Sequence, residues 1–577
     1  MSKLLLARKS LRVLSAVGWA TPVGLAIAIA STTIGRSDPA EPSIAWATTA
    51  AGSLVGTLLL WGAACALRHR AGHHVTILSA GLPLLAHMDS WLIVGFQYFH
   101  EPTNHLFATG LITDALFARP SVTEYLAVKH VLLSVIWITW PWISKRVEMP
   151  RRPLAPHAMQ GGLIVIAVLG AIAYLRLTVL DVLEIQVPSD LRVNYIGALA
   201  MLEGLNPYDN AVALKIAGRE RIPYVGTQLW TMVTNPPTAM LYFAPFTIAP
   251  LAVARILFLT ASHLALLATA VLTWRLLRPS PHPLVWLGLL LGLVAFLDPF
   301  ALTFRLGQVD LVILFTLTLA AYRLRNGDDI WAGMAVGIAA GLKLSPGLFV
   351  LYLLWRGHRR ALAGTFVTAA LVGLASLRLA GTETWLYYLS NRLPDLLAGS
   401  SLFNNLSLPG LILRVFMGPE LGQTMLDPQP PVALAQIMTI ISILAILIIA
   451  GWALGHRNRS GSSLALEFSL VVTVMLLISG VTWPHYLCWI FPLLGLAAAW
   501  QWPSRSSHWT IFLASLGLGI TAIPIDTYYG LIGNVFDHSI TIQSLRTIGL
   551  LTLLLGLAHG VRHAPSANDT STTRKIS

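Results

Sequence analysis

Residues 331–355 read WAGMAVGIAAGLKLSPGLFVLYLLW, an apolar run that contains a single charged side chain, Lys343. Basic clusters flank the run, at 323–325 and at 356–360. The run is long enough for one bilayer crossing, which takes about 20 residues. One crossing would, however, place the two basic clusters on opposite sides, against the positive-inside rule. Because Pro346 disfavours helix at the residue before it, the run predicts two short helices that meet at Lys343 near the outer membrane face.

The composition of the whole chain places it in a membrane. Its 577 residues are 55% hydrophobic and 11% charged, with a mean hydropathy of +0.70. Soluble domains carry about 25% charged residues. Apolar stretches recur from end to end between short turns rich in Arg and Pro, which favours a helical bundle over a barrel. The predicted fold class is an all-α polytopic membrane protein with about sixteen passes and with short interfacial helices in its outer loops.

The net charge of +13 follows from topology, because Arg and Lys collect in alternate loops. Nucleic acid is therefore not a predicted partner. With the basic loops and both termini in the cytoplasm, the longer loops lie outside, at about residues 181–236, 298–308, 381–432, 479–485 and 524–544. The two cysteines, Cys65 and Cys488, exclude a disulfide framework and make a thiolate metal site unfavourable.

The chain divides at the basic, proline-containing turn 149–153. Residues 1–150 form an additional membrane block of about four predicted helices. Residues 151–563 form a core of about twelve helices. The polar tail at 564–577 has the composition of a disordered cytoplasmic end.

Ionisable groups in or beside apolar segments are costly and are default functional candidates. Asp190 opens an outer loop, where a helix N-cap is the alternative interpretation. Lys343 and Arg305 suit contact with a phosphate; the alternatives are a lysine that snorkels to the interface and an arginine in a structural ion pair. His485 suits orientation of a sugar hydroxyl or pairing with a carboxylate, and it equally suits a satisfied interfacial position.

Three neutral side chains suit a sugar. Trp483 offers a stacking face, although aromatic residues are common at this membrane depth. Asn404 and Asn405 suit hydrogen bonds to sugar hydroxyls, and a turn is the alternative interpretation.

No cofactor is predicted, and a divalent cation is not indicated. The N-terminal block is dense in potential metal ligands, but their spacing matches no metalloprotease motif and polar packing explains them as well. These residues are His87, Asp89, His100, Glu101 and His105.

A set of short segments in a fixed order carries a family resemblance. From about residue 157 to the end, about two thirds of the chain, the sequence resembles the actinobacterial polyprenyl-phosphate-mannose-dependent alpha-mannosyltransferases, glycosyltransferase family 87 of the GT-C fold. The segments are Asp190-Leu191-Arg192-Val193 with 204–209, Asn235-Pro236-Pro237 with 243–245, Gly307-Gln308-Val309-Asp310, Gly341-Leu342-Lys343-Leu344-Ser345-Pro346, Asn404-Asn405-Leu406-Ser407 and Trp483-Pro484-His485.

The resemblance implies a GT-C helix bundle whose first outer loop supplies the catalytic aspartate. By position, Asp190 is the general base, His485 is the family histidine near the active site, and Lys343 with Gln308 faces the donor. Inversion at a beta-linked lipid sugar would give an alpha product. Asn194 stands where an aromatic residue is common in the family, with Tyr195 beside it as a candidate substrate contact, so this departure bears on the identity of the sugar.

The predicted function is transfer of mannose, from polyprenyl-phosphate-mannose to a cell-envelope glycolipid or polysaccharide, outside the cell membrane. Arabinofuranose as the transferred sugar is the alternative within this class. A transporter or flippase for a lipid-linked sugar is the alternative from another class. It predicts two related halves with broken helices at the midplane, and the sequence shows no such pairing. An inactive scaffold is a third possibility, which the retained Asp190, Lys343 and His485 argue against.

Overall fold

The computed structural model describes residues 164, 167–184, 189–222, 233–277, 282–418, 433–455, 461–490, 513–514, 516–517, 520–521 and 540–563. The predicted N-terminal block at 1–150 and the tail at 564–577 lie outside the described residues. All regular secondary structure among the described residues is helical, which confirms the predicted all-α class.

The described helices are mostly apolar. In chain order they are η2 (Leu175–Leu180), α7 (Asp181–Glu184), α8 (Ser189–Leu202), α9 (Asn210–Arg219), α10 (Pro237–Phe243), η4 (Ala244–Ile248), α11 (Leu251–Leu277), α12 (Pro283–Phe296), α13 (Asp298–Leu306), α14 (Asp310–Arg325), α15 (Asp329–Leu342), η5 (Ser345–Leu348), α16 (Phe349–Trp355), α17 (Arg359–Tyr387), η6 (Tyr388–Arg392), α18 (Leu393–Ala398), α19 (Leu408–Met417), α20 (Ala433–Leu454), α21 (Gly461–Ile478), η8 (Pro484–Trp489), α25 (Ile540–Gln543) and α26 (Leu545–Arg562).

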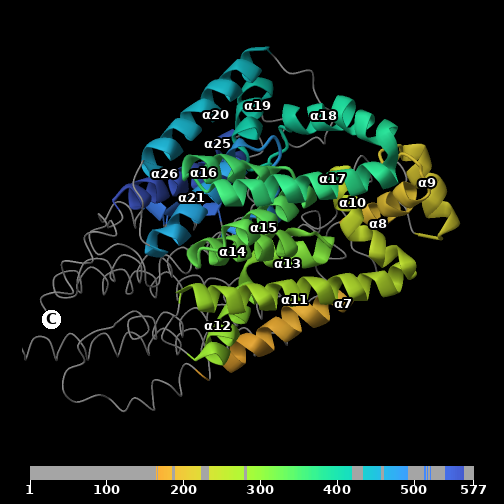
Figure 1. The fold of residues 1–577 in the computed structure, drawn as a ribbon, viewed down its shortest axis with the longest axis horizontal. Coiled ribbons are helices and arrows are strands. Elements are labelled where there is room, and N and C mark those ends of the chain that lie inside the picture. Colours follow the sequence, from red (N-terminus) through yellow and green to blue (C-terminus); the bar gives the residue numbers. More distant parts are fainter. Residues whose placement is uncertain are drawn as a thin grey trace, which may run out of the picture.

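A stack of helices forms the body of the structure. Helix α11 packs on α14, α14 on α15, and α15 on α17, while α20, α21 and α26 pack together beside this stack (Figure 1). The short helices α8, α9 and α10 lie together at one end (Figure 1). Helix α8 contacts the stack at α11 and α17, and it also packs on α10 and α13.

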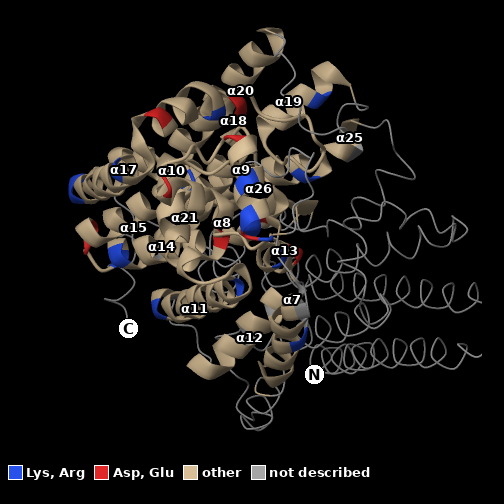
Figure 2. Cartoon of the chain, turned by 90° about the vertical axis from the view of Figure 1, so that its right-hand side faces the viewer, with Lys and Arg blue, Asp and Glu red and all other residues tan. Residues whose placement is uncertain are grey.

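Four described helices are long and apolar enough to cross a bilayer. They cover Leu251–Leu276, Arg359–Ala398, Ala433–Leu454 and Leu545–Arg562. Charged residues occupy only short stretches of the helices (Figure 2). These features confirm a polytopic membrane protein, whereas the predicted sixteen passes extend over the whole chain and stay a prediction.

The predicted pair of short helices between residues 331 and 355 is confirmed. Helix α15 ends at Leu342, and the backbone of Lys343 is extended, with φ −145° and ψ 143°. The short helix η5 carries Pro346 and leads directly into α16. Because proline suits the first turn of a helix and not its interior, the chain breaks where the sequence predicts it. We call α15, η5 and α16 (residues 329–355) the hairpin, and the break places Lys343 at its tip.

Close backbone contact holds the hairpin against α17. A Cβ atom added at Gly333 would lie 1.8 Å from the carbonyl oxygen of Ala361, and one added at Gly364 would lie 2.4 Å from that of Ile330. The Thr365 hydroxyl also donates a hydrogen bond to the Gly333 carbonyl at 3.0 Å. Small residues at a helix crossing allow this approach and are typical of packing inside membranes.

A buried ion pair holds the other end of the hairpin. Arg356, directly after α16, lies 2.7 Å from Glu467 of α21, and the Tyr352 hydroxyl donates to the same carboxylate at 3.0 Å. The two charged side chains are 10% and 4% exposed. Removing one partner of such a pair leaves an uncompensated charge, so the pair constrains how α16 sits on α21.

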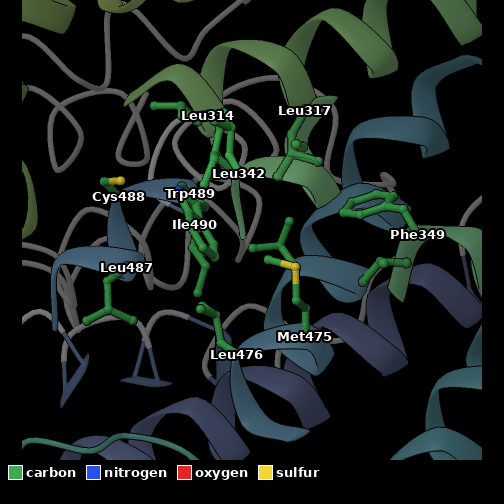
Figure 3. Packing of buried hydrophobic residues seen from close by; sticks show 14 of the residues in the cluster. Leu314, Leu317, Leu342, Phe349, Met475, Leu476, Leu487, Cys488, Trp489 and Ile490 are labelled. Carbon is green, nitrogen blue, oxygen red and sulfur yellow. The ribbon is translucent and has the colours of Figure 1, made fainter. Parts of the chain in front are cut away.

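Apolar side chains from several elements fill the space between these two anchors. Figure 3 shows Leu314 of α14, Leu342 of α15, Phe349 of α16, Met475 of α21 and Trp489 of η8 in one cluster. All five are at most 5% exposed. This core fixes the position of η8 relative to the hairpin tip.

The glycine contact between α15 and α17 yields a stability prediction. Gly333→Ala should destabilise the protein by about 1–3 kcal/mol, because the added methyl group meets backbone that cannot rotate away. A lower apparent melting temperature of the purified protein in detergent would show this. Gly373→Ala on α17 is the matched control, since a Cβ atom there meets nothing within 4 Å; equal melting temperatures for the two variants would contradict the packing argument.

Candidate active site

The carboxylate of Asp190 is bound by side chains from two parts of the chain. Asp190 is the second residue of α8, so it lies inside the first turn and not at the cap position. The Ser189 hydroxyl donates to Oδ1 at 2.8 Å, and the Gln308 amide donates to Oδ2. Burial raises the pKa of Asp190, against the opposing effects of these hydrogen bonds and of the charge on Lys343.

A chain of hydrogen bonds holds the start of α8 in place. The Asn194 amide donates to the Asp190 carbonyl at 2.7 Å, and the Asn235 amide donates to the Asn194 side-chain oxygen at 2.9 Å. The Tyr208 hydroxyl in turn donates to the Asn235 carbonyl at 2.9 Å. Asn194, the position that departs from the family pattern, thus supports the backbone behind Asp190.

Gln308 connects Asp190 to the hairpin tip. Helix α13 ends at Leu306, and the next residue, Gly307, has a φ of 71°, in the left-handed region that favours glycine. This turn leads into Gln308 just before α14. The side-chain oxygen of Gln308 accepts a hydrogen bond from the Lys343 ammonium at 3.3 Å, while its amide nitrogen serves Asp190.

Lys343 is paired with a carboxylate of its own. Its ammonium donates to both oxygens of Asp310, at 2.9 and 3.2 Å. The two side chains are 7% and 0% exposed. The ammonium also lies 3.8 Å from the centre of the Tyr486 ring, which is stacked on Trp489 at 4.9 Å. This cation–π contact covers the remaining side of the charge.

His485 lies on the other side of Asp310. Its Nε2 is 3.6 Å from Asp310 Oδ2, and its ring packs edge-on against Tyr486. Neither ring nitrogen has a hydrogen-bond partner. Burial, together with the charge on Lys343, holds the pKa of His485 well below its usual range. The imidazole is therefore neutral, with one donor and one acceptor free for a ligand.

Arg305 belongs to the last turn of α13, shortly before Gly307. Its Nη2 is buried without a hydrogen-bond partner. No ion pair joins Arg305 to any other residue in the part of the chain that the structure describes. The structural ion pair that the sequence left open for Arg305 is therefore not seen among these residues.

Two of the predicted substrate contacts are occupied by the protein itself. The Tyr195 hydroxyl donates to the Ala249 carbonyl at 2.9 Å, and its ring belongs to an apolar cluster with Ile216 of α9. The Asn405 amide group donates to the carbonyls of Ser400 and Gly480, and its oxygen accepts from the backbone of Ser407 and Thr482. The turn interpretation suits Asn405, and the roles of Tyr195 and Asn405 as substrate contacts stay predictions.

The other two predicted sugar contacts, Asn404 and Trp483, lie close to Asn405 in the fold. Asn404 is 8% exposed, and its side-chain oxygen is buried without a partner. Trp483 packs against Leu402 and Phe403 at the start of η8. Their roles stay predictions.

The residues that sequence reasoning missed are the ones that surround Lys343. The sequence indicates Asp310 only as part of the segment Gly307-Gln308-Val309-Asp310, and it does not predict Tyr486 or Trp489 as neighbours of Lys343. A signal was present, because a buried lysine requires a counter-charge and Asp310 directly precedes an apolar run. Spacing could not identify it, since Asp310 and Lys343 stand 33 positions apart.

No three histidine, cysteine or acidic side chains gather as a metal site among the residues that the structure describes. The dense group at His87 to His105 lies outside these residues. The absence of a metal requirement stays a prediction.

Comparison with known proteins supplies a family. The model of glycosyltransferase family 87 matches residues 233–480, a range that holds Gln308, Asp310 and Lys343. Asp190 lies before this range and His485 just after it. No solved structure matches the chain.

Mycobacterial proteins are similar over a longer stretch. A polyprenol-phosphate-mannose-dependent alpha-(1-2)-phosphatidylinositol mannoside mannosyltransferase of Mycolicibacterium smegmatis is 28% identical over 356 residues, 58% of this chain and 74% of that protein. The protein of the same name in Mycobacterium tuberculosis is 24% identical over 57% of this chain and 73% of its own length. A phosphatidylinositol pentamannoside mannosyltransferase of Mycobacterium tuberculosis is 30% identical over 45% of this chain and 57% of its own length.

The family match and the relatives confirm the resemblance that the ordered segments indicate. Together with the apolar helical fold, they identify the chain as a membrane glycosyltransferase whose residues 233–480 match the model of glycosyltransferase family 87.

Proposed function

We propose that the protein transfers mannose from polyprenyl-phosphate-mannose to a mannosylated glycolipid, with inversion and with Asp190 as the general base. The observation that carries this proposal is the Asp190 carboxylate, held by Gln308 and Ser189 beside a buried ionic cluster. The names of the relatives favour mannose over arabinofuranose as the sugar and phosphatidylinositol mannosides as the acceptor class. A polysaccharide acceptor remains the alternative within the same reaction.

The proposed reaction is a single displacement. Asp190 accepts the proton of an acceptor hydroxyl while that oxygen attacks the anomeric carbon of the donor. The bond from this carbon to the phosphate oxygen breaks, and the polyprenyl phosphate leaves with the electron pair. The leaving group is already anionic, so it needs little help from an acid. A base is most effective when its pKa approaches the working pH, and burial raises the pKa of Asp190 in that direction.

His485 suits contact with the sugar. Its neutral ring keeps both nitrogens free, and Asp310 and Tyr486 fix the ring plane. A buried polar group without a partner costs free energy until a ligand satisfies it. A hydroxyl of mannose or of the acceptor would supply the missing hydrogen bonds.

The proposed site opens to the outer face of the membrane. One observation supports this orientation: the basic clusters collect in the loops opposite to Asp190. The N-terminal block at 1–150 would then be an addition to the core, and we propose that it docks a partner or the acceptor.

Replacing Asp190 tests the base. Asp190→Asn should lower transfer from polyprenyl-phosphate-mannose to a phosphatidylinositol mannoside by about 10²–10⁴-fold, because the amide cannot accept the proton. Binding of the donor should persist. The matched control is Glu220→Gln, an exposed carboxylate after α9 in the same loop. Unchanged transfer by Asp190→Asn would contradict the assignment, and a parallel assay with polyprenyl-phosphate-arabinose would settle the sugar.

Cysteine labelling tests the orientation. In a Cys65→Ser background, Lys215→Cys on α9 should react with a membrane-impermeant maleimide on intact cells, because this exposed helix lies in the same loop as Asp190. Asn326→Cys between α14 and α15 is equally exposed and should react only after permeabilisation. Labelling in the reverse order would place the proposed site in the cytoplasm and contradict the topology.

A further inference from the structure

The ammonium of Lys343 already has three hydrogen-bond acceptors within the protein. An ammonium carries three donors. These serve the two oxygens of Asp310 and the side-chain oxygen of Gln308, at 2.9, 3.2 and 3.3 Å. The Tyr486 ring covers another side of the charge at 3.8 Å. A phosphate would have to displace one of these partners before Lys343 could bind it.

The charge balance also disfavours a phosphate at this place. Asp190 and Asp310 carry two negative charges, Lys343 carries one positive charge, and His485 is neutral. These four side chains together carry a net charge of −1, and the positive charge of Arg192 acts on Asp190 from outside this group. A polyprenyl-phosphate sugar is a phosphodiester with one negative charge, and its leaving group gains more. Like charges at short distance in a buried site repel strongly.

The contacts of Gln308 indicate that Lys343 orients this amide and does not bind a phosphate. An amide has one end that donates and one that accepts, and the two ends can exchange by a flip. The ammonium only donates and the carboxylate only accepts, so the two together fix one orientation. Gln308 must turn its oxygen to Lys343 and its N–H to Asp190. A flipped amide would turn its oxygen toward the base and its N–H toward the ammonium, so Lys343 adds to the orientation that the Asp190 carboxylate already favours.

We infer two roles, which rest on the proposed function. Asp310 is a positioning residue, because it holds Lys343 where the ammonium orients Gln308 toward the base Asp190. Arg305 binds the phosphate of the donor. Arg305 stands three positions before Gln308, in the last turn of α13. Its buried Nη2 has no hydrogen-bond partner, as a site without its anion requires. A guanidinium presents paired N–H groups in a plane, which matches two phosphate oxygens.

Steady-state kinetics of the full-length protein test this division. The donor is polyprenyl-phosphate-mannose and the acceptor a phosphatidylinositol mannoside. Asp310→Asn and Lys343→Met should each lower kcat by about tenfold or more, with the KM for the donor within about threefold of wild type, because they disturb the base and not donor binding. Arg305→Met should raise the KM for the donor by about tenfold or more.

The pH profile adds a readout that a structural defect would not move. Ser189, Gln308, Lys343, Arg192 and Asp310 all influence the Asp190 carboxylate. Loss of the negative charge on Asp310 should lower the pKa of Asp190. Since the base must be ionised, the acid limb of kcat should move to lower pH in Asp310→Asn. Glu467→Gln is the matched control, because it removes a carboxylate from an equally buried pair with Arg356 and should leave the acid limb in place.

The outcomes separate the two proposals. Absence of transfer by the wild type from this donor would overturn the proposed function and this inference with it. With an active wild type, a raised donor KM in Lys343→Met or an unchanged KM in Arg305→Met would overturn the inference alone. The same holds if Asp310→Asn shares the pH profile of Glu467→Gln.

Discussion

The buried pair between Lys343 and Asp310 is the interaction on which the rest of the site depends. Removing one partner of a buried ion pair costs about 3–5 kcal/mol, so each partner stabilises the other. The pairing sets the local fold: the helix must break after Leu342 so that the hairpin tip meets the start of α14. The aromatic rings of Tyr486 and Trp489 then shield the pair, and the indole of Trp489 donates to the Asp310 carbonyl at 3.0 Å.

The hairpin serves this pair from both of its ends. Close contact at Gly333 holds α15 on α17, and the ion pair of Arg356 and Glu467 holds α16 on α21. The tip between them has little freedom, which suits a group that must orient an amide to a fraction of an ångström. Rigid support of this kind keeps the Asp190 carboxylate and the Lys343 ammonium close without a direct ion pair, because Gln308 lies between them.

The sequence alone predicted much of this arrangement. The hairpin is predictable because one apolar run is flanked by a basic cluster at each end. The positive-inside rule places both clusters on the same side of the membrane, so the run must turn back. Asp190, Gln308, Lys343 and His485 were selected separately, and the structure brings them together. The partners were harder to predict. Whether Tyr195 or Asn405 faces a ligand or the protein depends on which backbone carbonyls approach them, and the approach of Ala249 and Gly480 is decided by packing between distant segments.

A double-mutant cycle tests the central claim, that Lys343 acts on Asp190 through Gln308. The measurement is kcat of Gln308→Leu, Lys343→Met and the double variant, each with its melting temperature. If Gln308 transmits the effect, the losses are strongly non-additive and the double variant is about as active as the worse single variant. Losses that multiply across the two sites would mean that the residues act independently and would contradict the account.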